Sequence, residues 1–292
     1  MNAGIAQAIA AYLWWGLFPI YYKQILSVPI DEILAHRAIW SFVFVAAVLL
    51  LTGRVSGLLR AVGAPRTLGI FAASAVLVFV NWGAYVVAIA ADRITDASLG
   101  YFINPLMSVL LGALMLGERL RPGQWAAVGL AALGVLQLTW HAGTVPWIGL
   151  AIALSFTLYG LLRKTAPLGA VEGLCLESLL MLPFALAYVG WLAVTGKEVF
   201  LTQPPALSAL VMLSGVVSAT PLLLFAAAAR RIPLSTLGLI QYLAPSMQLV
   251  LAIYVYGEPF GAGKALGFIA IWAGLAVYTA EGVWRTWRRA VA

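Results

Sequence analysis

Two short stretches of the chain combine proline with amide and aromatic side chains inside apolar sequence. Tyr101, Asn104 and Pro105 belong to the first, and Gln241 and Pro245 belong to the second. A proline within a helix donates no backbone hydrogen bond, so the carbonyl four residues earlier loses its donor. The sequence therefore predicts open carbonyls at Tyr101 and Gln241. Carbonyls, amides and ring faces can bind an ammonium group, which makes both stretches candidates for substrate binding.

Other apolar stretches add side chains of the same kinds. Pro19 is expected to open the carbonyl of Trp15, and Asn81 and Tyr85 lie four residues apart, on one face of a helix. The alternatives are aromatic packing around a tolerated kink at Pro19 and an interhelical hydrogen bond from Asn81. The predicted substrate-binding residues are Trp15, Asn81, Tyr85, Tyr101, Asn104, Tyr159, Gln241, Tyr242 and Ser246, and the predicted hinges are Pro19, Pro105 and Pro245.

Ionisable residues offer few further candidates. Glu177 is the acid placed more than one turn inside an apolar stretch, so it is a possible coupling residue; alternatively it pairs with Arg163 or Lys164. Asp31 and Glu32 open an apolar stretch, where a helix N-terminus favours acids. We favour that structural role over a substrate gate.

The sequence does not predict a catalytic site or a cofactor-binding site. Cys175 is the only cysteine, so the sequence predicts neither a disulfide nor a metal site. His36 and His141 fall at the edges of apolar stretches, and the chain has no HExxH or P-loop motif. The sequence thus predicts no enzyme, no cofactor and no nucleic-acid partner.

Composition defines the elements that must position these residues. The chain has 292 residues, of which 63% are hydrophobic and 9% charged, with a mean hydropathy of +1.00. A soluble protein needs more charged surface, whereas runs of about 20 apolar residues are typical of membrane-spanning helices. We predict an all-α polytopic membrane protein. The predicted spans are 4–26, 33–52, 67–91, 96–117, 122–141, 145–164, 172–195, 206–229, 235–257 and 262–284.

The distribution of Lys and Arg predicts the orientation of these spans. With the N-terminus in the cytoplasm, twelve basic residues fall on the inner side and five on the outer side. Because basic residues concentrate on the cytoplasmic side, we expect both termini in the cytoplasm and the chain in the inner cell membrane.

An internal repeat relates the two halves of the chain at an offset of 140 residues. Pro105 aligns with Pro245, Gly117 and Glu118 align with Gly257 and Glu258, and Gly134 aligns with Gly274. The two copies begin five spans apart, and an odd number of crossings reverses the direction of equivalent helices. The sequence predicts two inverted five-helix repeats, 1–141 and 142–292, around a central cavity. Such symmetry is typical of secondary transporters that work by alternating access.

Six strings of residues carry a resemblance to a known family. They are DEILAHRAIWS (31–41), DASLGYFINPL (96–106), LGERLRPGQW (116–125), LYGLLRK (158–164), LSTLGLIQYLAP (234–245) and YGEP (256–259). In these strings the chain resembles the RarD branch of EamA-type carriers in the drug/metabolite transporter superfamily, and it is similar in kind to the YddG amino-acid exporters. The resemblance implies ten helices in two inverted halves and export of small metabolites, often amino acids.

Substrate and mechanism leave alternatives open. We expect a secondary transporter that exports amino acids or related amines, with a small-molecule substrate and lipid as its partners. A drug or lipophilic-cation exporter and a channel-like facilitator are the alternatives. The small multidrug members of the superfamily trade protons for cations at a carboxylate in their first helix, but residues 4–26 contain no acid. That coupling mode is therefore not expected, and the oligomeric state is left open.

Overall fold

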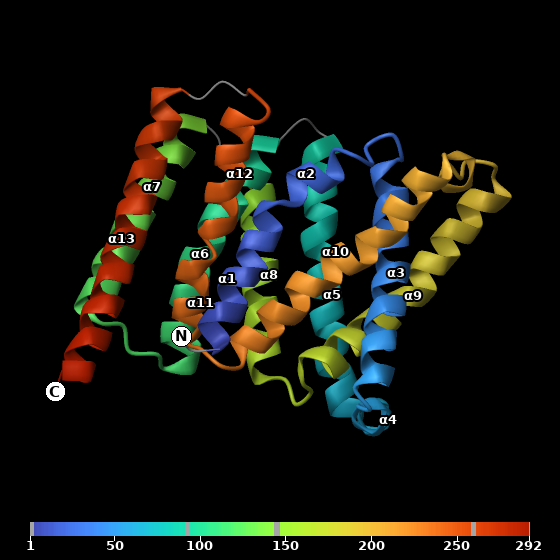
Figure 1. Ribbon diagram of the computed structural model, residues 1–292, viewed down its shortest axis with the longest axis horizontal. Helices are drawn as coiled ribbons and strands as arrows, with labels where there is room; N and C mark the ends of the chain where they lie inside the picture. Colours follow the sequence, from blue (N-terminus) through green and yellow to red (C-terminus); the bar gives the residue numbers. More distant parts are fainter. Residues whose placement is uncertain (1–2, 91–93, 143–146, 258–260, 292) are drawn as a thin grey trace. The chain divides into compact units, whose positions relative to one another are not determined.

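The computed structural model describes residues 3–90, 94–142, 147–257 and 261–291, and within them the chain forms helices joined by turns, without strands (Figure 1). Each helix satisfies its own backbone hydrogen bonds, as apolar surroundings require. The helices are α1 (Ala3–Gly16), α2 (Phe18–Tyr22), α3 (Ile30–Leu51), α4 (Val55–Val62), α5 (Pro65–Ala90), α6 (Ile94–Leu116), α7 (Pro122–Ala142), α8 (Trp147–Thr165), α9 (Ala170–Val194), η1 (Phe200–Thr202), α10 (Pro205–Ala229), α11 (Leu234–Ile240), α12 (Leu243–Tyr254) and α13 (Ala262–Val291).

Every predicted span coincides with helical residues, but two of them are interrupted. The first is divided into α1 and α2 at Leu17, and the ninth into α11 and α12 at Gln241 and Tyr242. Among the described residues, seven helical stretches are long and apolar enough to cross a membrane, and Gly100–Leu116 and Ala265–Glu281 are shorter apolar stretches. The chain is therefore an all-helical polytopic membrane protein, and the number of ten crossings stays a prediction.

The helices form two compact units that do not follow the order of the chain. Unit 1 contains Met1–Phe79 and Leu162–Arg231, and unit 2 contains Val80–Leu161 and Ile232–Ala292. In unit 1, α3 packs against α9 and α10, and α1 packs against α10. In unit 2, α13 packs along α7, and α11 packs along α6. Each unit thus takes helices from both halves of the chain.

Helix starts in the two parts of the chain repeat at the predicted spacing of 140 residues. The pairs are α3 and α9 (Ile30, Ala170), α5 and α10 (Pro65, Pro205), α6 and α11 (Ile94, Leu234), and α7 and α13 (Pro122, Ala262). The turns after α6 and α12 also correspond, because Gly117 and Gly257 have φ angles of 63° and 65°. Glycine adopts this left-handed conformation without steric cost.

Matching helices pack against each other in opposite directions. In the α7–α13 pair of unit 2, a Cβ on Gly134 would lie 2.5 Å from the carbonyl oxygen of Gly267, and one on Gly274 would lie 2.7 Å from that of Ala127. The two contacts are equivalent under the repeat, because Gly134 matches Gly274 and Ala127 matches Gly267 at the 140-residue offset. Since later residues of α7 meet earlier residues of α13, the two helices are antiparallel. Glycine permits this close backbone approach.

The α6–α11 pair repeats the antiparallel arrangement. A Cβ on Gly238 would lie 2.8 Å from the carbonyl oxygen of Pro105, and one on Gly112 would lie 3.1 Å from the amide nitrogen of Ser235. The carboxylate of Glu118 accepts hydrogen bonds from the N–H groups of Leu234 (2.6 Å) and Ser235 (2.9 Å). It therefore caps the start of α11, where free N–H groups favour an anion, and fixes α11 beside the end of α6.

Candidate functional site

The break between α11 and α12 lies at two of the predicted binding residues. Gln241 follows α11 and is buried, and Tyr242 precedes α12. The amide of Ala244 donates to the carbonyl of Gln241 at 3.2 Å, so the expectation of an open carbonyl at Gln241 is wrong. The chain tightens to a bond between residues three apart and replaces the donor that Pro245 lacks. The helix is nevertheless interrupted between Ile240 and Leu243, close to Pro245, where the proline predicts a distortion.

Tyr242 fixes the start of α12 against α6. Its hydroxyl donates to the carbonyl of Phe102 at 3.1 Å, and the two rings stack with their centroids 6.5 Å apart. Phe102 and Tyr242 occupy matching positions of the two halves, 140 residues apart. Both belong to the apolar core of unit 2 with Phe268 and Ile271. Tyr242 is fully buried there, so its role in the structure is to pack and to anchor the helix.

Two of the predicted polar residues join other helices to α8. The Asn81 side chain on α5 donates to the carbonyl of Ile152 at 2.9 Å and to the hydroxyl of Ser155 at 3.2 Å. The Thr157 hydroxyl donates to the side-chain oxygen of Asn104 on α6 at 2.7 Å. All these side chains are buried. The interhelical hydrogen bond considered as the alternative for Asn81 is therefore present.

The predicted aromatic residues of unit 2 differ in exposure. Tyr85 and Tyr101 form an edge-to-face pair with centroids 6.1 Å apart, and Tyr85 is 40% exposed. Tyr159 is fully buried and lies 5.8 Å from the ring of Phe156. Only the first pair thus combines an exposed ring with a half-buried one, an arrangement that can present ring faces to a solute.

The remaining predicted residues of unit 2 are Pro105 on α6 and Pro245 and Ser246 on α12. The Ser246 hydroxyl accepts a hydrogen bond from the indole nitrogen of Trp272 at 2.8 Å, which joins α12 to α13. Pro105 lies within α6, which continues through it as one helix, whereas Pro245 follows a break by only a few residues. The matching prolines thus have different effects on their helices.

In unit 1, a tryptophan that the sequence analysis did not select satisfies a proline-freed carbonyl. The indole nitrogen of Trp14 donates at 2.9 Å to the carbonyl of Val217, four residues before Pro221 in α10. The neighbouring Trp15 packs its ring against Tyr12 and Phe225, at 5.5 Å and 5.9 Å between centroids. The position of Pro221 indicates that the carbonyl of Val217 loses its backbone donor. The replacement donor, Trp14, lies 203 positions away in the chain, so sequence spacing does not identify it.

Pro19 begins a separate helix instead of bending a continuous one. It is the second residue of α2, which starts after the interruption at Leu17. Proline is well tolerated in the first turn of a helix because the N–H groups there have no intrahelical partner. The structure therefore shows an interruption of the helix at Leu17, and the hinge role of Pro19 stays a prediction.

Glu177 forms the ion pair that was one of its two expected roles. The Arg163 guanidinium donates to its carboxylate at 3.3 Å, the Ser74 hydroxyl donates to the same oxygen, and all three side chains are buried in unit 1. Arg163 also donates to the carbonyl of Ala170 at 3.0 Å, and its guanidinium lies 5.4 Å from the centre of the Phe71 ring. The sequence analysis considered Arg163 only as a possible partner of Glu177, whereas the structure shows a buried residue with several partners.

The predicted site residues therefore gather largely in unit 2. Apart from Trp15, Pro19 and Glu177, all of them belong to that unit. The amides of Asn81 and Asn104 and the hydroxyl of Ser246 hold helices together. A role of Tyr85, Tyr101 and Gln241 in substrate binding stays a prediction. The many apolar helices, with one broken near mid-length beside a proline, define a polytopic membrane protein of the transporter class.

Comparisons with known proteins place the chain within that class. The model of the EamA-like transporter family matches residues 2–140. The chain is 44% identical to an uncharacterized transporter of Pseudomonas aeruginosa, over 99% of this chain and 97% of that protein. It is 42% identical to the protein RarD of Escherichia coli, over 96% and 95%. The chain therefore belongs to the EamA-like transporter family and to its RarD-like branch.

A solved structure supports the fold. A crystal structure that is 20% identical in sequence superimposes with a TM-score of 0.71, covering 96% of this chain and 98% of that one. At this identity the likeness extends to the fold and not to the substrate.

Proposed function

We propose that the chain is a secondary transporter that exports amino acids or related amines across the inner membrane by alternating access. The observation that carries this proposal is the antiparallel packing of matching helices, seen in the contacts of Gly134 and Gly274. It supports two inverted repeats, 1–141 and 142–292. The ten crossings and the cytoplasmic location of both termini belong to the same proposal and are supported by the apolar runs and by the distribution of Lys and Arg. In carriers of this plan, the two states are related by the symmetry of the halves.

The substrate class follows from the chemistry of the predicted site. The rings of Tyr85 and Tyr101 can attract an ammonium group by about 0.5–2 kcal/mol each, and Gln241 can accept or donate a hydrogen bond. Phosphorylated substrates need a cationic clamp. Two arginines are buried among the described residues. Arg163 is already paired with Glu177, and Arg37 donates to the hydroxyl of Tyr22 at 3.4 Å, so both are engaged within the protein. A zwitterion or an amine is therefore favoured over a nucleotide or a sugar phosphate.

Counterflow in proteoliposomes tests the proposal. Purified protein is reconstituted, loaded with an unlabelled amino acid and assayed for uptake of the labelled one, with and without a pH gradient. We expect saturable exchange and competition among related amino acids. Exchange of lipophilic cations alone would favour the drug-exporter alternative, and large ohmic currents in electrical recordings would favour a channel.

Substitution of Gln241 by leucine tests the position of the site. Gln241→Leu should weaken the apparent affinity for labelled amino acid about tenfold, because a hydrogen bond to a charged group is lost. Gln137→Leu, the same change on α7 of the same unit, is the matched control and should exchange as the wild type does. Monodisperse protein on size-exclusion chromatography checks folding. Wild-type affinity in Gln241→Leu would remove this residue from the site without affecting the proposed class of transporter.

A further inference from the structure

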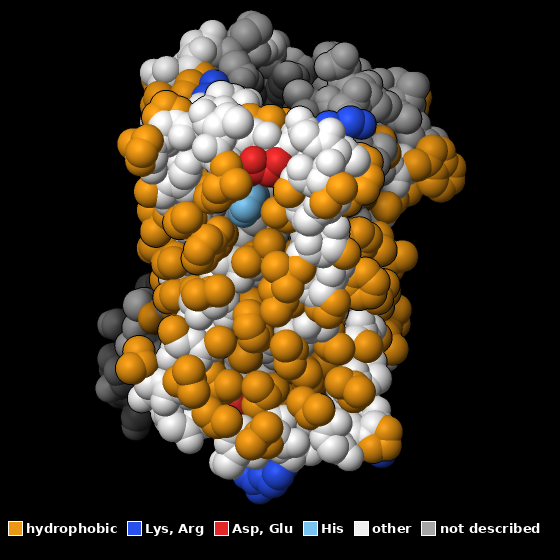
Figure 2. All heavy atoms as spheres, turned by 90° about the vertical axis from the view of Figure 1, so that its right-hand side faces the viewer, with side chains coloured by type: hydrophobic (Ala, Val, Ile, Leu, Met, Phe, Trp, Pro, Cys, Tyr) orange, Lys and Arg blue, Asp and Glu red, His pale blue; other side chains and the backbone are white. Residues whose placement is uncertain are grey.

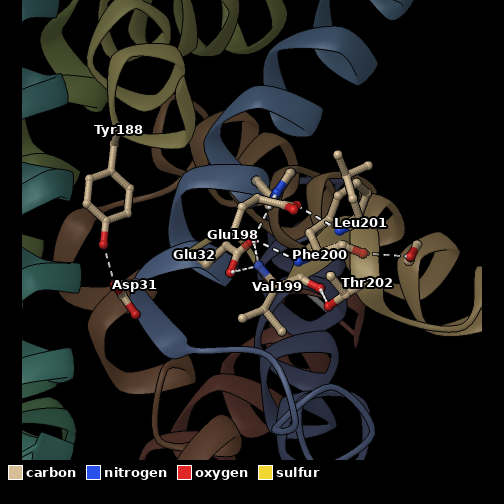
Figure 3. Close-up of polar contacts among 10 residues, drawn as sticks. Asp31, Glu32, Tyr188, Glu198, Val199, Phe200, Leu201 and Thr202 are labelled. Atoms are coloured by element: carbon tan, nitrogen blue, oxygen red, sulfur yellow. Dashed lines mark hydrogen bonds and ion pairs between the residues drawn. The ribbon is translucent and has the colours of Figure 1, made fainter. Parts of the chain in front are cut away.

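A buried histidine and two acidic residues converge where α3 begins in unit 1. Glu32 and His36 lie four residues apart on α3, and Glu198 precedes η1 in the connection from α9 to α10. One potential ligand atom from each residue lies within 4.8 Å of the other two. Figure 2 shows acidic side chains next to a histidine on a largely apolar face, and Figure 3 shows Glu32 and Glu198 near each other beside Val199.

Glu32 is held rigidly by the backbone of the connecting segment. Its carboxylate accepts hydrogen bonds from the amides of Val199 and Phe200 at 2.9–3.1 Å, and its side chain is 1% exposed (Figure 3). A carboxylate offers about four lone-pair positions, of which these bonds use three. One position is left for a further partner, and hydrogen bonds of this kind commonly orient carboxylates that bind metal ions.

His36 is the independent indication that a ligand is bound. Its side chain is 7% exposed, yet neither ring nitrogen has a hydrogen-bond partner among the described residues. One nitrogen, Nε2, lies 3.9 Å from the carboxylate of Glu32, too far for a hydrogen bond, while the ring packs against Phe200. Burial of an unpaired polar group costs free energy, and a cation held between the imidazole and the carboxylates would remove that cost for Nε2.

We propose that Glu32, His36 and Glu198 bind a divalent transition-metal ion of the zinc class. One imidazole nitrogen and two carboxylate oxygens suit such an ion, and three protein ligands leave a coordination position for water. Two carboxylates and a neutral imidazole also balance the charge of the ion. A cavity of about 320 Å³, lined by Glu32 together with Asp31, Tyr188 and Lys197 among others, lies beside one of the three proposed ligands. The ion would fasten α3 to the α9–α10 connection.

The sequence analysis predicted no metal site because it considered the single cysteine. The Glu32–His36 spacing is the signal it contained, since residues four apart share a helical face. Glu198 completes the group from 162 positions further along the chain, and only the fold brings it there. The site is independent of the proposed transport function.

Zinc titration of the full-length protein tests this inference. The protein is purified in detergent, stripped of metal and titrated with ZnCl₂ by calorimetry. We expect one ion bound per chain and a rise in the unfolding temperature on zinc addition. His36→Leu and Glu198→Gln should each weaken zinc binding at least ~10-fold, since even losses outside the ligand set have such effects. Glu172→Gln is the control for the loss of an acid elsewhere in unit 1, and it should bind as the wild type does.

The two variants separate loss of the metal from loss of the fold. Leucine keeps an apolar surface against Phe200, and glutamine at 198 keeps an oxygen for the Leu201 amide, which donates to Glu198 at 2.7 Å. Both metal-free variants should therefore unfold at or near the wild-type temperature. If His36→Leu does not fold, Glu198→Gln decides alone. Absence of saturable zinc binding in the wild type, or undiminished binding in the folded variants, would overturn the site.

Discussion

At the scale of single residues, the buried carboxylate of Glu177 shows how a charge is accommodated inside an apolar unit. Arg163 and Ser74 approach it from α8 and α5, and Arg163 also bonds to the backbone at the start of α9. Such a pair need not stabilise the protein more than apolar residues would, but removal of one partner leaves a buried charge. The geometry therefore favours a structural role over coupling.

Single and double substitutions at this ion pair distinguish the two roles. Glu177→Gln should lower the free energy of unfolding by about 3–5 kcal/mol because Arg163 loses its counter-charge. The double variant Glu177→Leu with Arg163→Leu should regain most of that loss, measured by denaturant titration in detergent. A double variant that is folded but no longer responds to a pH gradient in counterflow would instead assign ion coupling to the Glu177–Arg163 pair.

At the scale of helices, the sequence predicts well where helices lie along the chain and predicts poorly where a helix is interrupted. Each of the ten predicted apolar runs coincides with helical residues in the described part of the chain, since a helix that satisfies its own backbone groups is the stable form of such runs in lipid. Prolines mark the sites of distortion, yet α6 continues through Pro105 whereas α11 ends before Pro245. The difference depends on tertiary contacts, such as the bond of Tyr242 to Phe102, which local sequence does not reveal.

The candidate site shows the same limit. Asn81 and Asn104 stand out in sequence because amides are rare in apolar spans, but their partners on α8 become visible only in the fold. Glu118 was recognised as part of the repeat, and its role as the cap of α11 was not predicted. The capped amides lie 116 and 117 positions away, beyond the range of any spacing argument.

Replacement of Pro245 tests the importance of the break. Pro245→Ala restores an N–H that can donate to the carbonyl of Gln241 and join α11 to α12 as one helix. We expect severalfold slower counterflow with unchanged protein yield. Pro105→Ala, at the matching position of a continuous helix, should slow exchange less. Wild-type rates in both variants would reduce the prolines to packing residues.

At the scale of the whole molecule, matching helices contact each other within a unit. The α3–α9 pair lies in unit 1, and the α6–α11 and α7–α13 pairs lie in unit 2. The hydroxyl of Tyr188, late in α9, bonds to Asp31 at the start of α3, so this pair is antiparallel as well. Such an arrangement is expected if the two halves of the chain have opposite orientations in the membrane.

Accessibility labelling tests that orientation. The turns after α3 and α9 correspond, since each contains a threonine followed by a glycine with a φ angle of 67°. Cys175→Ala provides a background without cysteine, into which Thr52→Cys and Thr195→Cys are introduced singly. In intact cells, a membrane-impermeant maleimide should label position 195 and reach position 52 only after the cells are opened. Labelling of both positions from one side would contradict the inverted repeats.

The division into units also bears on the order in which the protein is built. Unit 1 needs residues 162–231, and unit 2 needs residues 232–292. During synthesis, α1 must therefore wait for α10, α3 for α9 and α10, α6 for α11, and α7 for α13. When the first half leaves the ribosome, these four helices still lack the neighbours that cover their inner faces, and neither unit can be completed until the second half has entered the membrane.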